Sequence, residues 1–504
     1  MTNKKEELLS LLLKRLQQVD SSVIDQTIAL LKSGTSDTTS AVGKKTYPWT
    51  DVGNAERFVD KYGKVVRYNF TDKVWYVFDG KTWQRDEGNQ VLALATKLNS
   101  HVDIDDLIAY SPDPKHAEQA AAHYQNKLAT TRTIKNMLEL VKAQLPVKHG
   151  AFNQQPFSLN LKNGTLNLQS TDLTKHSAKD LIDKIAPVTY NENAKCPLWI
   201  TFLKQTFQNN EELIKFIQRA VGYSITGDTS EQVMFLLVGD GKNGKSVFIN
   251  TIAKLLGNYA KNMNSQSIMI KRDSASHDLA RLEDARLVIS SESNEGERID
   301  ESLVKSLTGQ DTIVARYMFG SEFEFTPKFK LWMATNHRPI IRGTDKGIWR
   351  RLVIVPFKYT VPDSQVDKHL EQKLERELPG ILNWALAGTQ AWLQEGLQLP
   401  QVVIDENKSY QKQMNVIDQF LSDCIYDKTG ETDENGQPYK IKTSYTYQLY
   451  RKWAKLNGAY MMSNIRFGAE MRKKYNRMHF SDGDYYINCT KSIEGSRVDG
   501  SIAQ

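Results

Sequence analysis

A glycine-rich loop between Gly239 and Ser246 has the residue types and spacing of a phosphate-binding loop. In VMFLLVGDGKNGKSVFIN, from Val233, it follows a short apolar run and precedes a helix-like stretch, as a Walker A loop requires. Its glycines let successive N–H groups face phosphate oxygens, and the helix adds its positive end. A plain glycine-rich turn is the alternative. The predicted nucleotide-binding residues are Gly239, Asp240, Gly241, Lys242, Asn243, Gly244, Lys245, Ser246 and Val247.

This loop predicts ATP and Mg²⁺ as cofactors. Lys245 would reach the β- and γ-phosphates, and Ser246 would ligate the metal. An acidic group is also needed beside the metal and the attacking water. ARLVISSESNEG, from Ala285, reads as a buried strand that ends at Glu292, whose carboxylate would orient and deprotonate water. Because serine replaces the usual first carboxylate, we expect its metal contact to run through water; Glu295 is a weaker candidate, and a solvated strand-end glutamate is the alternative.

Two later stretches carry polar groups suited to phosphoryl transfer. KFKLWMATNHRP ends an apolar run at Asn336, whose amide can hydrogen-bond the γ-phosphate and the lytic water. GTDKGIWRRLVIVPF places Arg350 and Arg351 ahead of another strand. An arginine at such a position often forms only a salt bridge. With Glu292 and Asn336 upstream in order, a catalytic arginine is the better interpretation.

The elements that position these residues alternate as strands and helices, which predicts an α/β nucleotide-binding core. The chain has 504 residues and ordinary globular composition, so we expect two to four domains. A net charge of +7 permits a nucleic-acid partner without demanding one. Three scattered cysteines predict neither disulfides nor a zinc site. No apolar run is long enough for a membrane span, so a soluble protein that is not secreted is expected.

Four regions follow from the patterning. Residues 1–46 read as an amphipathic helix and a polar linker, and 47–205 as a mixed α+β domain with hairpin turns at Asp79-Gly80 and Asn163-Gly164. Residues 91–145 read as helical. Aromatic residues in the strands, Trp75, Tyr76 and Trp83, could stack on bases but are more often core. The ATPase core is assigned to 206–400 and a C-terminal domain to 401–504.

The C-terminal domain has winged-helix order. From Thr443 the pattern predicts a helix, a turn at Asn457-Gly458, a second helix, and a hairpin that turns at Ser481 to Asp484. Basic side chains on the second helix and its exit suit phosphate contacts; a solvated basic helix is the alternative. These predicted DNA-binding residues are Arg466, Arg472, Lys473, Lys474 and Arg477.

Together, GYSITGDTSEQVMFLLVGDGKNGKSVF, ARLVISSE, KSLTGQDTIVARYMFGSEFEFTPKFKLWMATN and GTDKGIWRRLVIVPF resemble the superfamily 3 helicases of the phage and plasmid primase-helicase family, related to the poxvirus-type helicase-primase. The resemblance implies an AAA+ ring, usually a hexamer, that binds ATP between subunits, translocates 3′-to-5′ on single-stranded DNA and unwinds duplex. By position, Lys245 and Ser246 correspond to Walker A, Glu292 to Walker B and Asn336 to the sensor. Arg351, with Arg350 as the alternative, resembles the arginine finger that reaches the neighbouring subunit's nucleotide.

The stretches TIVARYMF and EFEFTP alternate about Gly320-Ser321 and predict a hairpin. In the family, the hairpin before the sensor strand projects into the ring channel and grips DNA. By position, the resemblance points to DNA contacts from Lys305, Arg316, Tyr317 and Phe319. Packing within the hairpin is an equal alternative for the two aromatic residues.

The expected activity is that of a replicative helicase for a phage or mobile element in the cytoplasm of a bacterial host, acting on single-stranded and forked DNA. Only a helix and a linker precede Tyr47. A primase domain, which needs clustered metal-binding carboxylates on strands, is therefore not expected, and a separate primase or polymerase could be a partner. The alternatives are a DNA packaging or remodelling ATPase, and a non-motor origin-binding or scaffold protein whose nucleotide is structural.

Overall fold

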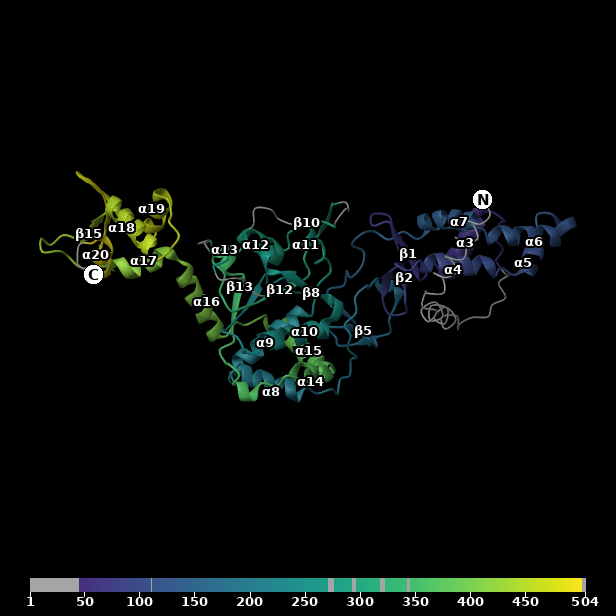
Figure 1. Ribbon diagram of the computed structural model, residues 1–504, viewed down its shortest axis with the longest axis horizontal. Coiled ribbons are helices and arrows are strands. Elements are labelled where there is room, and N and C mark those ends of the chain that lie inside the picture. The colour runs from purple at the N-terminus through teal and green to yellow at the C-terminus, as the bar shows by residue number, and fades with distance from the viewer. Residues whose placement is uncertain are drawn as a thin grey trace.

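The computed structural model describes residues 45–109, 111–270, 276–291, 296–317, 322–341 and 345–500. These residues form three parts in a row, with the N-terminal part at one end, a central part built on a sheet, and the C-terminal part at the other end (Figure 1). The helix and linker expected within residues 1–46 lie outside the described residues, except for Lys45 and Thr46.

The N-terminal part joins a small antiparallel sheet to a group of helices. The predicted turn at Asp79-Gly80 connects β2 to β3, and the Asp79 carboxylate accepts hydrogen bonds from the backbone N–H groups of Lys81 and Thr82. Tyr76 and Trp83 are buried, which confirms that they are core residues. The elements are α3 (Asp51–Tyr62), β1 (Val66–Asn69), β2 (Val74–Phe78), β3 (Trp83–Arg85), α4 (Gln90–Ser100), α5 (Ile104–Ala109), α6 (Ala117–Leu128) and α7 (Thr131–Gln144).

A second hairpin links the N-terminal part to the central part. β4 (Ser158–Leu161) pairs with β5 (Gly164–Asn167) across the predicted Asn163-Gly164 turn. The buried Leu159 and Leu161 of this hairpin belong to the hydrophobic core of the central part, together with side chains of α8 (Pro197–Thr206). The buried side chains of the N-terminal core lie between Ala55 and Phe152, and Ala178 and Leu181, after the hairpin, also pack against that core. The second hairpin therefore contributes to the central core, whereas the segment after it returns to the N-terminal core. The domain boundary expected at 205 stays a prediction.

The central part is a parallel five-stranded sheet with the order β13-β7-β12-β9-β8. β7 and β13 are apolar along their whole length, and β9 and β12 are mainly apolar, as expected for a parallel sheet covered on both faces, whereas the edge strand β8 is mostly polar. They are β7 (Met234–Val238), β8 (Ala260–Asn264), β9 (Leu287–Ser291), β12 (Lys330–Thr335) and β13 (Leu352–Pro356). The sequence-based expectation of an α/β core is confirmed.

Alternate side chains of these strands enter two different cores. Phe235 and Leu237 of β7 pack on one face, where α9 (Glu211–Ser224), α10 (Lys245–Leu256) and α15 (Leu378–Glu395) contribute to the same core. Met234 and Leu236 pack on the other face. That face is covered by α12 (Glu301–Thr308), the hairpin of β10 (Ile313–Arg316) and β11 (Glu322–Phe325), α13 (Lys346–Trp349) and part of α16 (Gln401–Met414).

The C-terminal part contains the predicted helices and hairpin in the predicted order. α18 (Thr443–Leu456) and α19 (Asn464–Arg472) precede β16 (Arg477–Phe480) and β17 (Gly483–Ile487), which pair antiparallel. β15 (Lys440–Lys442) pairs with the other side of β17. This module follows α16 and α17 (Val416–Cys424) and has its own core, which includes Phe420, Tyr450 and Phe467.

Candidate nucleotide-binding site

The glycine-rich loop leaves the end of β7 and runs directly into α10. Gly241, Lys242 and Gly244 have positive φ angles of 96°, 48° and 85°, a region that glycine adopts without steric cost. At Gly239 a Cβ would lie 2.2 Å from Asn243 Nδ2 and 2.3 Å from the Phe357 carbonyl oxygen. The loop path therefore requires glycine at this position.

The start of α10 is suited to an anion. Its N-cap residue, Gly244, has no side chain to accept hydrogen bonds from the first turn of the helix. Backbone N–H groups at a helix N-terminus carry partial positive charge and bind phosphate well. Of the flanking predicted residues, Asp240 and Ser246 are exposed and Val247 is half-buried. The Lys242 ammonium lies 2.6 Å from the Asp363 carboxylate.

Lys245 is 6% exposed, and its ammonium is held by oxygen atoms from two elements. Its Nζ donates hydrogen bonds to the Gly239 carbonyl at 2.6 Å, to Asn243 Oδ1 at 3.0 Å and to Asn336 Oδ1 at 3.0 Å. The Asn243 amide is fixed in turn, because its Nδ2 donates to the Phe357 carbonyl at 3.2 Å. The lysine of the loop is thus placed before any ligand arrives.

Asn336 reaches Lys245 because β12 lies next to β7 in the sheet. Thr335 is the register partner of Val238, so both strands end at the same edge. The Thr335 hydroxyl donates to the His337 carbonyl at 2.7 Å and accepts from the His337 N–H at 3.1 Å. This turn directs Asn336 toward the loop. The predicted sensor residue and the predicted Walker A lysine are therefore in direct contact.

The acidic candidates follow β9. Its last residue, Ser291, is the register partner of Ala334 in β12, so this strand ends at the same edge as β12 and β7. Glu292 and Glu295 lie outside the described residues, and their roles stay predictions. Among the described residues, no group of three or more His, Cys, Asp and Glu side chains is arranged to hold a metal ion.

Arg350 and Arg351 lie at the opposite end of the strands from the loop. Leu352, the next residue, pairs with Met234 at the start of β7. The five residues of β7 therefore separate this position from the loop, a distance of about 16 Å along an extended strand. The arginines are not in contact with the loop of their own chain.

The two arginines differ in exposure but share a partner. Arg351 is 9% exposed and donates to the Gly347 carbonyl at 2.9 Å and to Gln232 Oε1 at 3.4 Å. Arg350 is exposed and donates to the same Gln232 oxygen at 3.0 Å. Burial, and after it the charge of Arg350, lowers the pKa of Arg351. Gln232 was not expected from the sequence, because its meeting with the arginines depends on the pairing of β7 with β13.

The residues assigned to DNA contacts at the channel hairpin do not all lie on the hairpin itself. Arg316 and Tyr317 lie on the hairpin at the end of β10, whereas Lys305 lies on α12 and forms an ion pair with Asp345. The Tyr317 ring stacks on Phe323, with centroids 5.0 Å apart, and its hydroxyl donates to Glu283 at 3.4 Å. Phe319 lies outside the described residues.

The basic residues of the C-terminal part are at the surface. Lys473 pairs with Glu470 at 2.8 Å, Lys474 pairs with Asp418 at 3.0 Å, and Arg477 pairs with Asp484. Arg466 and Arg472 are exposed residues of α19. These side chains are accessible to a ligand, although three of them already have an acidic neighbour.

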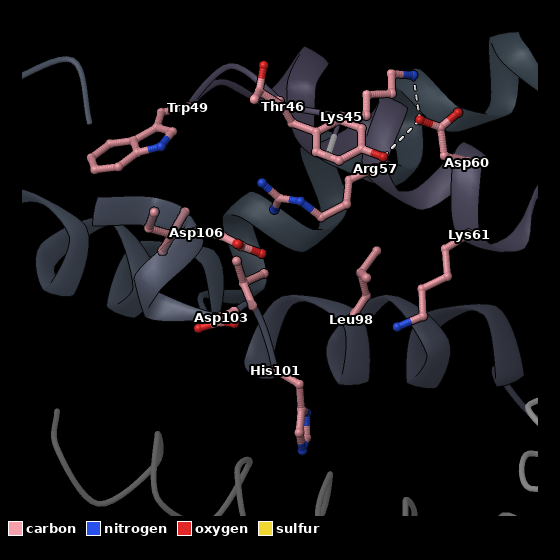
Figure 2. Close-up of a pocket in the computed structure, with 13 residues that line it drawn as sticks. Lys45, Thr46, Trp49, Arg57, Asp60, Lys61, Leu98, His101, Asp103 and Asp106 are labelled. Carbon is pink, nitrogen blue, oxygen red and sulfur yellow. Dashed lines mark hydrogen bonds and ion pairs between the residues drawn. The ribbon is translucent and has the colours of Figure 1, made fainter. Parts of the chain in front are cut away.

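A separate hollow of about 470 Å³ lies in the N-terminal part, far along the chain from the loop (Figure 2). Lys45 and Tyr47 both point to the Asp60 carboxylate, at 2.5 Å and 2.9 Å. Trp49 stacks on Tyr124 at 4.8 Å. Since its cations and carboxylates lie side by side, this hollow has no concentration of positive charge like that of the loop. It does not compete for the nucleotide assignment.

The chain is similar in sequence to two protein families and to several named viral proteins. Residues 55–208 match the family described as "D5 N terminal like", and residues 237–351 match a family of unknown function (DUF5906). A protein of Acanthamoeba polyphaga mimivirus named a putative helicase is 23% identical over 80% of this chain and 45% of its own length. A putative helicase of frog virus 3 is 28% identical over 48% of this chain and 26% of its own.

A putative primase of African swine fever virus is 25% identical over 39% of this chain and 21% of its own length. The chain thus spans about half or less of these relatives. The solved apo structure of the NrS-1 C-terminal region aligns with a TM-score of 0.48 and 9% identity, covering 87% of this chain and 98% of that one. None of the helices in the described ranges is both long and apolar enough to cross a bilayer.

The family resemblance drawn from the motifs is confirmed by these sequence relatives. The chain carries a D5 N-terminal-like domain, and its relatives in large DNA viruses are named helicases and primases, which fits the superfamily 3 helicase-primase family.

Proposed function

We propose that this chain is an ATP-dependent DNA helicase built on an AAA+ core, which assembles into a ring, most simply a hexamer, and separates duplex strands while moving 3′-to-5′ on single-stranded DNA. The observation that carries the proposal is the contact between Lys245 and Asn336. These residues are 91 positions apart and meet at 3.0 Å. A lysine and an amide at one sheet edge are the pair that phosphoryl transfer needs for positioning and charge compensation.

The residues present fit ATP with Mg²⁺. The loop path requires glycine at Gly239, and Gly244 leaves the N-terminus of α10 without a side-chain cap. Lys245 would exchange some of the oxygen atoms of Gly239, Asn243 and Asn336 for phosphate oxygens. The exposed Ser246 hydroxyl would ligate Mg²⁺, which supplies charge neutralisation of the phosphates when bound.

Hydrolysis would rest on placement by this chain's own residues. Asn336 would orient the lytic water from the sensor position, and Glu292 would accept its proton. Asn243 would hold Lys245 in place, because its amide bridges the lysine and the Phe357 carbonyl. These are preorganised dipoles and charges, the type of group that contributes most to phosphoryl transfer.

The arginines would act on a neighbouring subunit. Arg350 and Arg351 lie at the edge of the sheet opposite to the loop of their own chain, so a ring is needed to bring them to a nucleotide. This placement supports a site shared between identical subunits. It also supports the AAA+ assignment, in which one subunit supplies the loop and its neighbour supplies the arginine.

DNA would be contacted at two places. The β10–β11 hairpin carries Arg316 and Tyr317 and would handle the translocating strand. The C-terminal module, with two helices followed by an antiparallel hairpin, has winged-helix order and exposes Arg466 and Arg472. This module would bind duplex or forked DNA through phosphate contacts.

Strand displacement from a forked duplex tests the proposal. Wild-type protein with ATP and Mg²⁺ should release the labelled strand, and Lys245→Ala should not. DNA-stimulated ATPase activity without strand release would favour a packaging or remodelling motor instead. ATP binding without turnover, even with single-stranded DNA present, would favour a non-motor scaffold. We do not propose that this chain synthesises primers. Incorporation of labelled nucleotides on a single-stranded template would show primase activity and contradict this part of the proposal.

A further inference from the structure

The segment before β7 holds one glutamine in an unusual backbone conformation. Gln232 has φ = 54°, a left-handed conformation that is sterically unfavourable for residues other than glycine. Such a conformation persists only where neighbouring groups determine it, and it is often found at functional sites. The neighbouring groups here are well defined.

Two elements anchor the segment that ends at Gln232. Lys330 Nζ of β12 donates to the carbonyl oxygens of Thr226 at 2.6 Å and Asp228 at 3.0 Å. Trp392 of α15 donates from Nε1 to Glu231 at 2.8 Å. The Gln232 N–H itself donates to the Thr229 carbonyl at 3.1 Å. The backbone that carries the glutamine side chain is therefore fixed to the sheet and to α15.

The Gln232 side chain brings two cations together. Its Oε1 accepts hydrogen bonds from Arg350 Nη2 at 3.0 Å and from Arg351 Nη2 at 3.4 Å. An amide oxygen carries no charge to offset two guanidinium groups. Arg351 Nε is buried and has no hydrogen-bond partner among the described residues. Asp345 is one of the acids whose charge raises the pKa of Arg351, but its carboxylate forms an ion pair with Lys305.

We propose that Gln232 is a positioning residue for the arginines: it holds both guanidinium groups at the edge of the sheet with a neutral oxygen that the neighbouring subunit's phosphates can replace. The proposal rests on the proposed function, because it requires that the arginines serve a nucleotide in trans. The strain at Gln232 then has a purpose, since the left-handed backbone directs the amide to the two arginines immediately before β13.

The neutrality of the amide is central to this role. A phosphate forms charge-assisted hydrogen bonds with guanidinium that are stronger than those of an amide oxygen. The arginines can therefore leave Gln232 when a nucleotide is present. A carboxylate at the same position would bind both guanidinium groups strongly and would compete with the phosphate.

Three substitutions separate positioning from simple structural support. Gln232→Ala removes the shared oxygen, and Gln232→Asn withdraws it by one methylene while keeping a residue that tolerates left-handed backbone. Both should lower the kcat of ATP hydrolysis about tenfold with little change in KM. Gln232→Glu should lower kcat further although it stabilises the fold against heat. A purely structural role predicts the reverse order, with the glutamate variant the most active.

Gln398 provides a matched control. It is an exposed glutamine with φ = 48°, and its side chain donates to the Glu395 carbonyl, while Arg219 donates to its backbone carbonyl rather than to its side chain. Gln398→Ala makes the same backbone change as Gln232→Ala and should leave kcat unchanged. Equal activity of the two alanine variants would overturn the proposal.

Mixing experiments identify which subunit is affected. Gln232→Ala keeps an intact loop, and Lys245→Ala keeps intact arginines, so a mixture of the two proteins should regain ATPase activity. A mixture of Lys245→Ala with Arg351→Ala or Arg350→Ala should regain activity for the same reason. If an arginine variant is rescued and Gln232→Ala is not, Gln232 acts within its own subunit and the proposal fails. If both arginine variants retain full turnover while Lys245→Ala has none, the trans site itself is wrong and the role of Gln232 fails with it.

Discussion

The loop edge of the central sheet and the surface of the C-terminal module both carry cations that the sequence assigns to phosphates, but the two sets are held in different ways. Lys245 is buried and fixed by oxygen atoms of Gly239, Asn243 and Asn336. Lys473 and Lys474 are exposed and pair with nearby carboxylates. The Lys245 ammonium is held in position by neighbouring oxygen atoms, whereas Lys473 and Lys474 are exposed surface charges.

This difference predicts different consequences of substitution. A buried charge in a low-dielectric site strongly stabilises the charge that develops on the phosphates. Because its side chain is already in place, no free energy is lost in reorienting it during the reaction. Exposed ion pairs are worth about 0–1 kcal/mol each, so their lysines can exchange a carboxylate for a DNA phosphate. Loss of the buried Lys245 should therefore abolish turnover. Loss of the exposed lysines should weaken DNA binding in proportion to the charges removed.

The largest effect is expected from Lys245→Ala. Without its ammonium, the phosphates lose the charge that the loop supplies, and turnover should fall by at least about a thousandfold while the fold is retained. Steady-state ATPase assays with single-stranded DNA measure the loss. Lys254→Ala is the matched control, because Lys254 lies on the same helix but pairs with Glu371 and Glu375 at the surface. Activity above a tenth of wild type in Lys245→Ala would contradict the site.

Asn336→Ala should produce the next largest effect. It removes one of the oxygen atoms that hold Lys245 and also the amide proposed to orient water, so kcat should fall about a hundredfold. ATP affinity should change much less, because the loop and α10 are unaltered. Calorimetric titration with a non-hydrolysable ATP analogue, beside the ATPase assay, separates the two quantities. Equal losses of affinity and kcat would show that Asn336 serves binding rather than the chemical step.

The glycine-rich loop, the α/β core and the place of Asn336 at the end of a strand could be predicted because each depends on local spacing. Gly239 to Gly244 form the loop between β7 and the first residues of α10, Lys245 and Ser246, and Asn336 follows directly after the mainly apolar strand β12. The contact between Lys245 and Asn336 could only be implied by the family resemblance, since it requires β12 to lie beside β7. Strand order in a parallel sheet is decided by long-range packing.

Other features could not be predicted for the same reason. Gln232 meets Arg350 and Arg351 only through the pairing of β7 with β13. Lys305 was assigned to DNA by position, but it lies on α12 and pairs with Asp345, which is 40 residues away. Basic composition predicts surface charge without showing which acidic residues will be neighbours, as Lys474 and Asp418 illustrate.

Simultaneous change of Arg472, Lys473 and Lys474 to alanine should have a moderate effect. Each lost phosphate contact reduces the dependence of log K on log salt, so the slope for fork DNA should flatten by about two to three contacts. Basal ATPase should be little changed, because these residues lie outside the nucleotide site. Fluorescence anisotropy across a salt series measures the slope.

A second triple variant controls for net charge. Lys162, Lys175 and Lys179 are exposed lysines around the second hairpin, and their replacement by alanine removes the same total charge. Its salt slope should match that of wild type. If both triple variants flatten the slope equally, the C-terminal module has no special role in DNA binding, and only the overall charge of the protein matters.

The smallest effect is expected at the junction between the N-terminal and central parts. His149 Nδ1 forms a hydrogen bond with the Asp72 carboxylate at 3.4 Å, and its Nε2 lies 3.2 Å from Glu283, within ion-pair distance although outside hydrogen-bond geometry. The ring also contacts Phe323 of the β10–β11 hairpin edge-on, with centroids 4.7 Å apart. His149→Gln removes the charge and should lower the free energy of unfolding by about 1.5–3 kcal/mol near neutral pH.

The pH dependence of that loss identifies its cause. Asp72, and after it Glu283, raises the pKa of His149 to about 10 from its ordinary 6.5. A group whose pKa is raised by folding contributes fully below the unfolded value, and its contribution declines as pH rises through the folded value. The difference between wild type and His149→Gln should therefore be large at pH 6 and nearly absent by about pH 10. The neighbouring Tyr317 does not titrate in this window, since burial, and after it Glu283, raises its pKa further.

Thermal unfolding of both proteins at several pH values measures this difference. His479→Gln is the control, because His479 also lies beside a carboxylate, that of Asp484, but its side chain is 80% exposed and such a pair contributes little. A difference at His149 that stays constant from pH 6 to about pH 10 would mean that packing against Phe323, rather than the imidazolium charge, stabilises the junction. A difference that disappears with rising pH would instead show that the imidazolium charge, shared by Asp72 and Glu283, joins the N-terminal part to the central part.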